Sequence, residues 1–166
     1  QFEKIFPGCR LLDIHEYLLE KGIRLDGVKG RRYLYHDPCH TPMKTIQGIK
    51  VANALMGQRV DLSDRCCGEA GTLAMARPDV STQVRFRKQE EIENGAVALR
   101  ADGFDGELKL LTSCPSCLQG LSRYNDDAGT QADYIVVEMA RRLLGENWLA
   151  EYVRKANAGG IERVLL

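Results

Sequence analysis

Three short segments with the character of β-strands each run directly into cysteine residues. Residues 32–36 are rich in aromatic side chains, residues 59–63 alternate polar and apolar side chains, and residues 107–112 are largely apolar. Segments with helical periodicity separate these strands, so strands and helices alternate along the chain. That alternation predicts a single α/β domain in which a parallel sheet carries helices on both faces, a Rossmann-like three-layer arrangement.

The helices of this domain are predicted from the spacing of apolar residues and from the signals at helix ends. Thr41 and Pro42 are typical of a helix start. In the last helix we expect Trp148, Tyr152 and Val153 to face inward. The expected helices cover residues 11–19, 41–57, 116–124, 134–144 and 146–156, with a long helix from Pro78 to the Asp102-Gly103 pair, and residues 161–166 form a last strand or a tail.

The long helix is strongly charged. We interpret its charged residues as a solvated face on which the two signs balance, with a lean of the basic groups toward an anionic site as the alternative. The basic residues concerned are Arg77, Arg85, Arg87 and Lys88, and the acidic ones are Glu90, Glu91 and Glu93.

The cysteines gather where a parallel sheet places its ligand sites. In open α/β sheets, ligands bind outside the carboxyl ends of the strands. Because each of the three predicted strands is followed by cysteine, three remote segments deliver five thiols to one edge of the sheet. These are Cys39, Cys66, Cys67, Cys114 and Cys117.

Five convergent thiols favour a metal cofactor. Thiolates are soft ligands suited to zinc and to iron–sulfur centres, and the Cys114-x-x-Cys117 spacing lets two sulfurs reach a common centre. The side chains of Cys66 and Cys67 diverge because the residues are consecutive, and Gly68 frees the backbone to bend. An extended multi-iron cluster can use all five thiols, whereas tetrahedral zinc leaves one spare.

Three alternatives to an iron–sulfur cluster stay open. A structural zinc site would use four of the thiols and would mediate contacts with partner domains or subunits. Cys66 and Cys67 would otherwise be small buried apolar residues. In a thiol–disulfide redox domain, Cys114 would be the nucleophile at a helix start and Cys117 would resolve the mixed disulfide.

The histidines have different expected roles. His36 and His40 bracket Cys39, and we expect them to support the site by hydrogen bonds or capping, with direct ligation as the alternative. Cys9 and His15 lack a partner pattern and are interpreted as structural.

Composition excludes several classes of function. The 166 residues carry 23 basic and 23 acidic side chains with no basic block, which argues against binding to nucleic acid. No apolar run reaches the roughly 18 residues of a membrane span. The six cysteines fit a reducing, cytoplasmic compartment better than a disulfide scaffold. The chain opens at Gln1 without a signal-peptide pattern, so we expect it to be a fragment of a larger protein.

The cysteine motifs together resemble a known family. The motifs are His36-Asp37-Pro38-Cys39-His40, Cys66-Cys67-Gly68 and Cys114-Pro115-Ser116-Cys117. They resemble the CCG cysteine-rich domain that heterodisulfide reductase shares with the iron–sulfur subunit of glycolate oxidase. The resemblance runs from Tyr35 to Tyr124 and looks closest to the C-terminal part of fused bacterial FAD-linked oxidases of the lactate or glycolate dehydrogenase type.

This resemblance implies a non-catalytic redox module. Residues 1–166 would be a cysteine-rich domain from a larger oxidoreductase acting on a 2-hydroxy acid, with FAD on the missing part. Its partners would be flavin and ferredoxin-type domains, and its location cytoplasmic, at the inner face of the membrane where the parent complex docks there. The gap between Cys39 and Cys66 is shorter than is usual in the family, and that between Cys67 and Cys114 is longer. The implied cofactor is a 4Fe–4S cluster of the non-cubane kind, or zinc as in some relatives, held by Cys39, Cys66, Cys67, Cys114 and Cys117.

Overall fold

Four parallel strands form the central sheet of the protein. The computed structural model describes residues 2–43, 45–69 and 71–159, and in it the strands lie in the order β2-β1-β3-β4. The strands are β1 (Arg31–His36), β2 (Val60–Ser63), β3 (Glu107–Thr112) and β4 (Gln131–Tyr134). Their register aligns the last residues, because His36 is paired with both Ser63 and Thr112, and Thr112 is paired with Tyr134. All four strands therefore end at one level.

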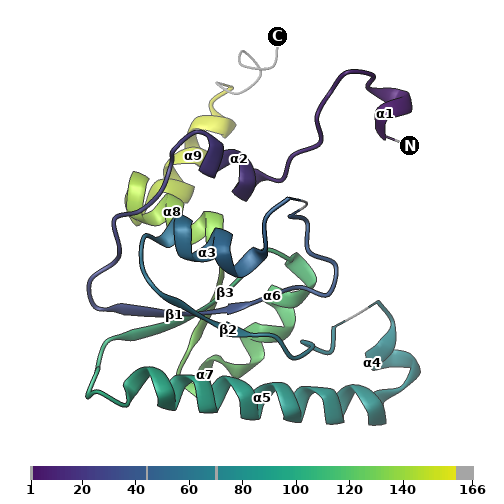
Figure 1. Ribbon diagram of the computed structural model, residues 1–166, viewed down its shortest axis with the longest axis vertical. Helices are drawn as coiled ribbons and strands as arrows, with labels where there is room; N and C mark the ends of the chain where they lie inside the picture. Colours follow the sequence, from purple (N-terminus) through teal and green to yellow (C-terminus); the bar gives the residue numbers. More distant parts are fainter. Residues whose placement is uncertain (1, 44, 70, 160–166) are drawn as a thin grey trace.

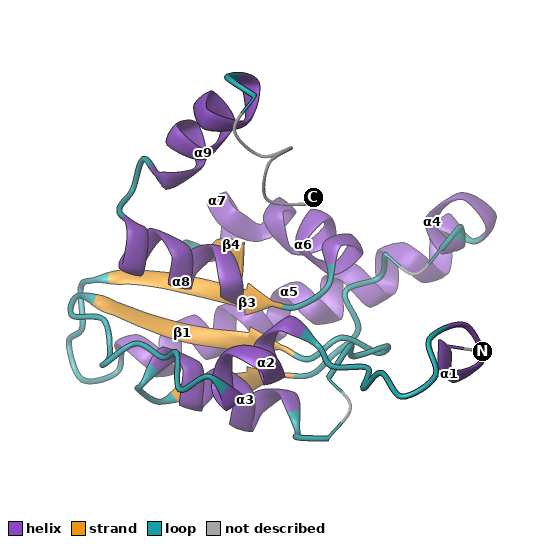
Figure 2. Ribbon diagram, turned by 90° about the horizontal axis from the view of Figure 1, so that it is seen from above, coloured by secondary structure: helices purple, strands orange, loops and turns teal. Residues whose placement is uncertain are grey.

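Helices cover both faces of the sheet, as predicted. Figures 1 and 2 show α3 and α8 on one face, and α5, α6 and α7 on the other. The helix α2 lies against α3. The bounds are α1 (Phe2–Ile5), α2 (Ile14–Glu20), α3 (Gly48–Met56), α4 (Leu73–Ala76), α5 (Pro78–Arg100), α6 (Pro115–Leu121), α7 (Asn125–Ala128), α8 (Ile135–Leu144) and α9 (Trp148–Asn157), with a 3-10 turn η1 at Ser122–Tyr124.

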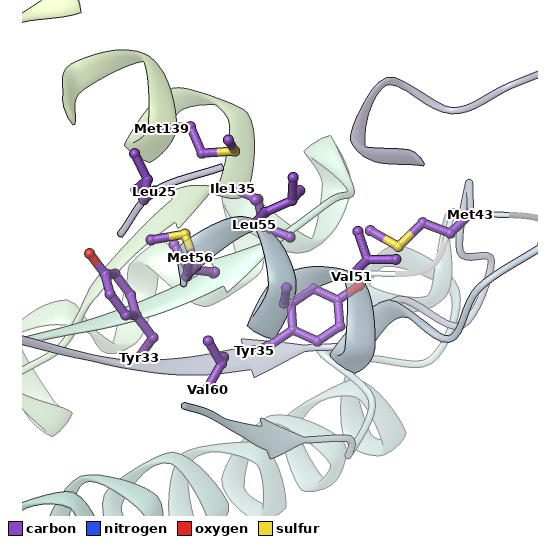
Figure 3. Close-up of a cluster of buried hydrophobic side chains, with 12 residues drawn as sticks. Leu25, Tyr33, Tyr35, Met43, Val51, Leu55, Met56, Val60, Ile135 and Met139 are labelled. Carbon is purple, nitrogen blue, oxygen red and sulfur yellow. The ribbon is translucent and has the colours of Figure 1, made fainter. Parts of the chain in front are cut away.

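The alternation of side chains along the strands builds two cores. Tyr33 and Tyr35 of β1 point toward α3 and α8 (Figure 3), whereas Leu34 between them packs on the opposite face. Leu110 and Leu111 of β3 divide in the same way. The second core includes Cys67 and Cys117 beside Ile92, Leu121 and Tyr124, so this apolar layer reaches the cysteines.

The start of α3 differs from the prediction. The helix begins at Gly48 and not at the Thr41-Pro42 pair. The Glu16 carboxylate of α2 accepts hydrogen bonds from the N–H groups of Thr45 and Ile46 and from the Thr45 hydroxyl. These amides are bound by a residue from another helix, so the preceding segment does not join the helical ladder.

Other boundaries follow local signals. Asp13 accepts a hydrogen bond from the N–H of His15 and caps α2, so this helix begins at Ile14 and not at residue 11. The predicted end near Gly22 is confirmed, and that glycine has a positive φ of 69°. The strand β4 was not predicted, because its Gln131-Ala132-Asp133-Tyr134 sequence lacks the apolar pattern of a strand.

The predicted inward face of the last helix is wrong. Tyr152 and Val153 are 53% and 45% exposed, Trp148 is half-buried, and every residue of α9 keeps some contact with solvent. Figure 2 shows α9 standing away from the sheet, which explains the exposure. The predicted element at 161–166 lies outside the described residues. Within the part of the chain that the structure describes, no helix is long and apolar enough to cross a bilayer.

Candidate metal centre

A cavity of about 260 Å³ lies beyond the carboxyl ends of the strands. All five cysteines of the sequence motifs line it, although they come from three separate parts of the chain. A single water molecule needs roughly 30 Å³, so the cavity has room for a group of several atoms. The lining residues are Pro38, Cys39, His40, Cys66, Cys67, Glu69, Gly71, Cys114, Ser116 and Cys117.

The strand ends position these cysteines. Cys39 lies in the loop after β1, and Cys66 and Cys67 follow β2. Cys114 is the N-cap of α6, and Cys117 lies in the first turn of that helix, just after β3. Because the three strands end in register, their loops meet at one edge of the sheet. The structure thus brings together all five thiols that the sequence places after strands.

Cys67 and Cys117 form the buried floor of the cavity. Their side chains are almost wholly buried, and their Sγ atoms lie 3.3 Å apart. The hydrogen bond from Cys117 lowers the pKa of Cys67 to about 4 against the opposing effect of burial, and the His36 ring and the backbone at Glu69 add to the lowering. The pKa of Cys117 is raised, first because its proton is bound to Cys67 and then by burial. The thiolate is therefore favoured at Cys67 and the thiol at Cys117.

The Cys66-Cys67 pair uses a bent backbone to place both sulfurs in the cavity. Gly68 has a φ of +78°, and a Cβ added there would lie 3.1 Å from Cγ of Arg85. The N–H of Gly68 donates to the Cys66 sulfur over 3.4 Å. This turn explains how consecutive cysteines line one cavity although their side chains diverge.

The outer side of the cavity is more open. Cys39 is exposed, and Cys66 and Cys114 are partly buried. The pKa of Cys39 is raised, first by burial of its sulfur and then by the neighbouring Cys66 and Cys67. The site therefore has a closed floor and an accessible mouth.

The two histidines beside Cys39 lie in different environments. His36 is fully buried at the end of β1, and one of its ring nitrogens lies within 4.8 Å of the sulfurs of Cys67 and Cys117. His40 is exposed and lines the mouth of the cavity. Of the two residues interpreted as supporting groups, His36 thus lies against the buried thiols.

Lys88 is fully buried, so the interpretation of this residue as part of a solvated face is wrong. Its Nζ donates to the carbonyl and hydroxyl oxygens of Ser63, 3.0 and 2.6 Å away, and to Glu91 at 2.7 Å. Burial lowers the pKa of Lys88, and Glu91 opposes this effect. The inward stripe of α5, with Ser81, Lys88, Ile92 and Ala96, is the signal that could have revealed it.

The remaining cysteine and histidine do not reach the cavity. Cys9 is exposed before α2 and does not line the cavity. His15 is buried and its Nδ1 pairs with Asp13 at 2.6 Å. Neither residue lines the five-thiol cavity. Their interpretation as structural residues stays a prediction.

The donor set fits a soft metal centre. Five cysteines line a cavity that has room for more than a single ion, and a ring nitrogen of buried His36 lies within 4.8 Å of two of the sulfurs. Thiolates and imidazole are the ligands of zinc and of iron–sulfur clusters, whereas magnesium and calcium prefer oxygen. The low pKa of Cys67 favours one thiolate near neutral pH, and metal binding would displace the proton of Cys117.

Comparison with known proteins agrees with this chemistry. A family described as a domain of unknown function, DUF3400, matches residues 122–166, which lie after the last motif cysteine. The chain is 29% identical to a subunit of the fumarate reductase (CoM/CoB) of Methanothermobacter marburgensis, over 64% of this chain and 21% of the relative. It is 26% identical to an uncharacterized iron-sulfur protein of Methanococcus maripaludis, over 78% of this chain and 26% of the relative.

A third relative is a subunit of a bacterial enzyme. The chain is 32% identical to the glycolate oxidase iron-sulfur subunit of Escherichia coli, over 51% of this chain and 22% of the relative. No solved structure matches the chain significantly. The chain spans about a quarter or less of the length of these relatives. These similarities to subunits of redox enzymes and to iron–sulfur proteins fit the resemblance to CCG-type iron–sulfur domains.

Proposed function

We propose that this chain is an electron-transfer domain that binds an iron–sulfur cluster through Cys39, Cys66, Cys67, Cys114 and Cys117. The observation that carries the proposal is the convergence of these five thiols on one cavity. Two of the three relatives described above are named as iron–sulfur proteins. A 4Fe–4S cluster, of the non-cubane kind that the motif resemblance implies, would use every thiol of the cavity.

The cluster would supply one-electron redox chemistry, and the chain would control its surroundings. Cys67 and Cys117 would hold it from the buried floor, where apolar neighbours from α5 and α6 exclude water. Exposed Cys39 and half-buried Cys114 would hold it at the mouth, within reach of a partner. The thiolate favoured at Cys67 would prepare the floor for metal binding.

The parent protein would be an FAD-linked oxidoreductase acting on a 2-hydroxy acid such as lactate or glycolate. The named activity of the glycolate oxidase relative supports this substrate class. The domain would be a non-catalytic module that relays electrons between flavin and ferredoxin-type domains of the same or a partner chain. A cytoplasmic location, with docking at the inner face of the membrane through the parent complex, belongs to the same proposal.

A structural zinc site is the second candidate, and one observation favours it. His36, Cys67 and Cys117 place three donor atoms within 4.8 Å of one another, all on buried residues. Three such donors with a fourth thiol are a tetrahedral zinc site. In that arrangement at least two of the five thiols stay unused.

The thiol–disulfide alternative has less support. It assigned the reactive pair to Cys114 and Cys117, whereas the close sulfur pair is Cys67 and Cys117. Cys67 also has the lowered pKa, and it is buried, whereas a reactive thiol needs access to its substrate.

Single cysteine variants separate the two candidates. Iron, zinc and acid-labile sulfide would be measured after anaerobic reconstitution of Cys66→Ser, Cys67→Ser and Cys9→Ser, the last being the matched control outside the cavity. We expect Cys66→Ser and Cys67→Ser each to lose the cluster and Cys9→Ser to keep it. Equal metal retention in Cys66→Ser and Cys67→Ser would refute the five-thiol cluster, and zinc lost in Cys67→Ser alone would support the zinc site.

A further inference from the structure

His36 offers a nitrogen donor beside the two buried thiols, Cys67 and Cys117. It is the last residue of β1 and is fully buried. A ring nitrogen lies within 4.8 Å of the sulfurs of both Cys67 and Cys117, and these three donor atoms are mutually within that distance. A buried imidazole beside two buried thiols has few arrangements that satisfy its polar atoms.

The hydrogen bonding of His36 fixes which nitrogen is free. Nδ1 lies 3.3 Å from the carbonyl oxygen of Ser63. A carbonyl oxygen only accepts hydrogen bonds, so Nδ1 carries the proton in this contact. In the neutral ring Nε2 then keeps its lone pair, and among the described residues Nε2 has no hydrogen-bond partner. A buried polar atom without a partner lowers the stability of the fold by about 1–3 kcal/mol. A ligand bound to the Nε2 lone pair would remove this cost.

The Ser63 carbonyl that orients the ring is itself fixed. Lys88 donates to this carbonyl from α5 over 3.0 Å, and the Ser63 hydroxyl donates to Glu91 over 2.7 Å. The ring therefore contacts a carbonyl group that belongs to a largely buried hydrogen-bond network. Histidines that bind metals typically donate their other ring N–H to a carbonyl or carboxylate, which sets the tautomer and the orientation.

We propose that Nε2 of His36 is a direct ligand of the metal atom that Cys67 and Cys117 also bind, so that the centre has mixed sulfur and nitrogen ligation. This inference rests on the proposed metal centre. It applies to iron and to zinc, because imidazole nitrogen is a good ligand for both. With five thiolates and one neutral nitrogen, the centre would carry one negative charge less than it would with a sixth thiolate in place of His36.

The competing arrangement is a hydrogen bond from a protonated His36 ring to the Cys67 sulfur. In that case both ring nitrogens carry protons, and the ring supports the thiolate without touching the metal. The two arrangements differ in one measurable quantity, the magnetic coupling between a paramagnetic metal centre and the histidine nitrogen.

Pulsed electron paramagnetic resonance of the reduced, reconstituted chain tests the ligand directly. The chain would be prepared with ordinary and with isotope-labelled histidine. We expect a strong nitrogen coupling that changes with the isotope, disappears in His36→Gln, and persists in His40→Gln and His15→Gln. Only a weak histidine coupling in the unsubstituted chain, or a strong coupling that survives in His36→Gln, would overturn the proposal.

A second variant guards against misfolding of the first. His36→Cys restores a ligand at the same position, so we expect it to bind metal while losing the strong nitrogen coupling. For the metal-free chain, Co²⁺ titration followed by absorption provides a readout without iron. His36→Gln should weaken Co²⁺ binding by at least about tenfold and shift the absorption bands, whereas His40→Gln should do neither.

The outcomes separate this inference from the proposed function. If iron and sulfide are absent from the reconstituted chain, the cluster proposal fails, and the Co²⁺ titration still decides whether His36 is a ligand. If the cluster forms without a strong histidine nitrogen coupling, the cluster proposal stands and the His36 proposal is refuted.

Discussion

Replacement of Glu138 by glutamine tests the electrostatic account of the fold. This carboxylate of α8 is fully buried. It lies 2.6 Å from a guanidinium nitrogen of Arg31, 2.9 Å from the Tyr33 hydroxyl and 2.9 Å from Nζ of Lys109. Burial raises the pKa of Glu138, but the hydrogen bonds and charges of Lys109 and Arg31 outweigh it and hold the pKa at about 2.

The expected magnitude follows from that pKa. A drop from the ordinary 4.5 to about 2 corresponds to roughly 3 kcal/mol of folding free energy, at about 1.4 kcal/mol per pH unit. Removing one partner of a buried ion pair typically costs about 3–5 kcal/mol, and the value obtained from the pKa lies at the lower end of that range. In a domain of this size it lowers the melting temperature by about 6–12 °C.

The pH dependence has a definite sign. The pKa of Glu138 is lower in the folded than in the unfolded chain, so its contribution is fully present above pH 4.5 and is lost as the pH falls toward 2. Urea unfolding of the metal-free chain, followed by circular dichroism, would measure the difference between wild type and Glu138→Gln. We expect about 3 kcal/mol near neutral pH and almost none near pH 2.

Glu146→Gln is the matched control. Both Glu138 and Glu146 form an ion pair with Arg142, and the Glu146 pair has a separation of 2.8 Å. The side chain of Glu146, however, is 62% exposed. Exposed pairs contribute about 0–1 kcal/mol, so this variant should unfold almost as the wild type does. A loss below 1 kcal/mol in Glu138→Gln, or a loss that stays constant from neutral pH to pH 2, would refute the reasoning.

Three further predictions concern backbone, core and surface. Gly57→Ala should destabilise the chain by at least about 2 kcal/mol, because Gly57 has a φ of +62° and a Cβ there would lie 1.9 Å from the carbonyl oxygen of Leu25; a urea midpoint like that of the wild type would contradict this. Ile92→Ala should cost about 2–5 kcal/mol in the same assay, since Ile92 is fully buried in the second core, and a cost below 1 kcal/mol would mean that the core is not packed as described. Cys9→Ser should leave stability within about 0.5 kcal/mol, because Cys9 is exposed, and any larger loss would assign Cys9 an unrecognised contact.

Much of the site was predictable because it depends on topology. Once strands precede Cys39, Cys66 and Cys114, parallel pairing alone brings their loops to one edge. The thiol convergence therefore needs no knowledge of side-chain packing. The roles of the five thiols as cluster ligands remain a prediction.

The features that were missed depend on contacts between distant residues. Glu16 of the distant helix α2 binds the backbone of the segment before α3. This contact prevents the helix from starting at the Thr41-Pro42 pair, although the local sequence favours a start there. Lys88 is buried because Ser63 and Glu91 satisfy its ammonium, a partnership that charge pattern alone does not reveal. In α9 the apolar spacing predicted an inward face, but the helix stands away from the sheet.

The identity of the bound cofactor is best tested on the unsubstituted chain. Iron, zinc and acid-labile sulfide would be measured with an absorption spectrum, after anaerobic purification and iron–sulfur reconstitution. The account predicts about four irons and four sulfides per chain, with the broad visible absorption of thiolate-bound iron. About one zinc per chain without sulfide, after the same reconstitution, would contradict the central claim that the five thiols hold an iron–sulfur cluster.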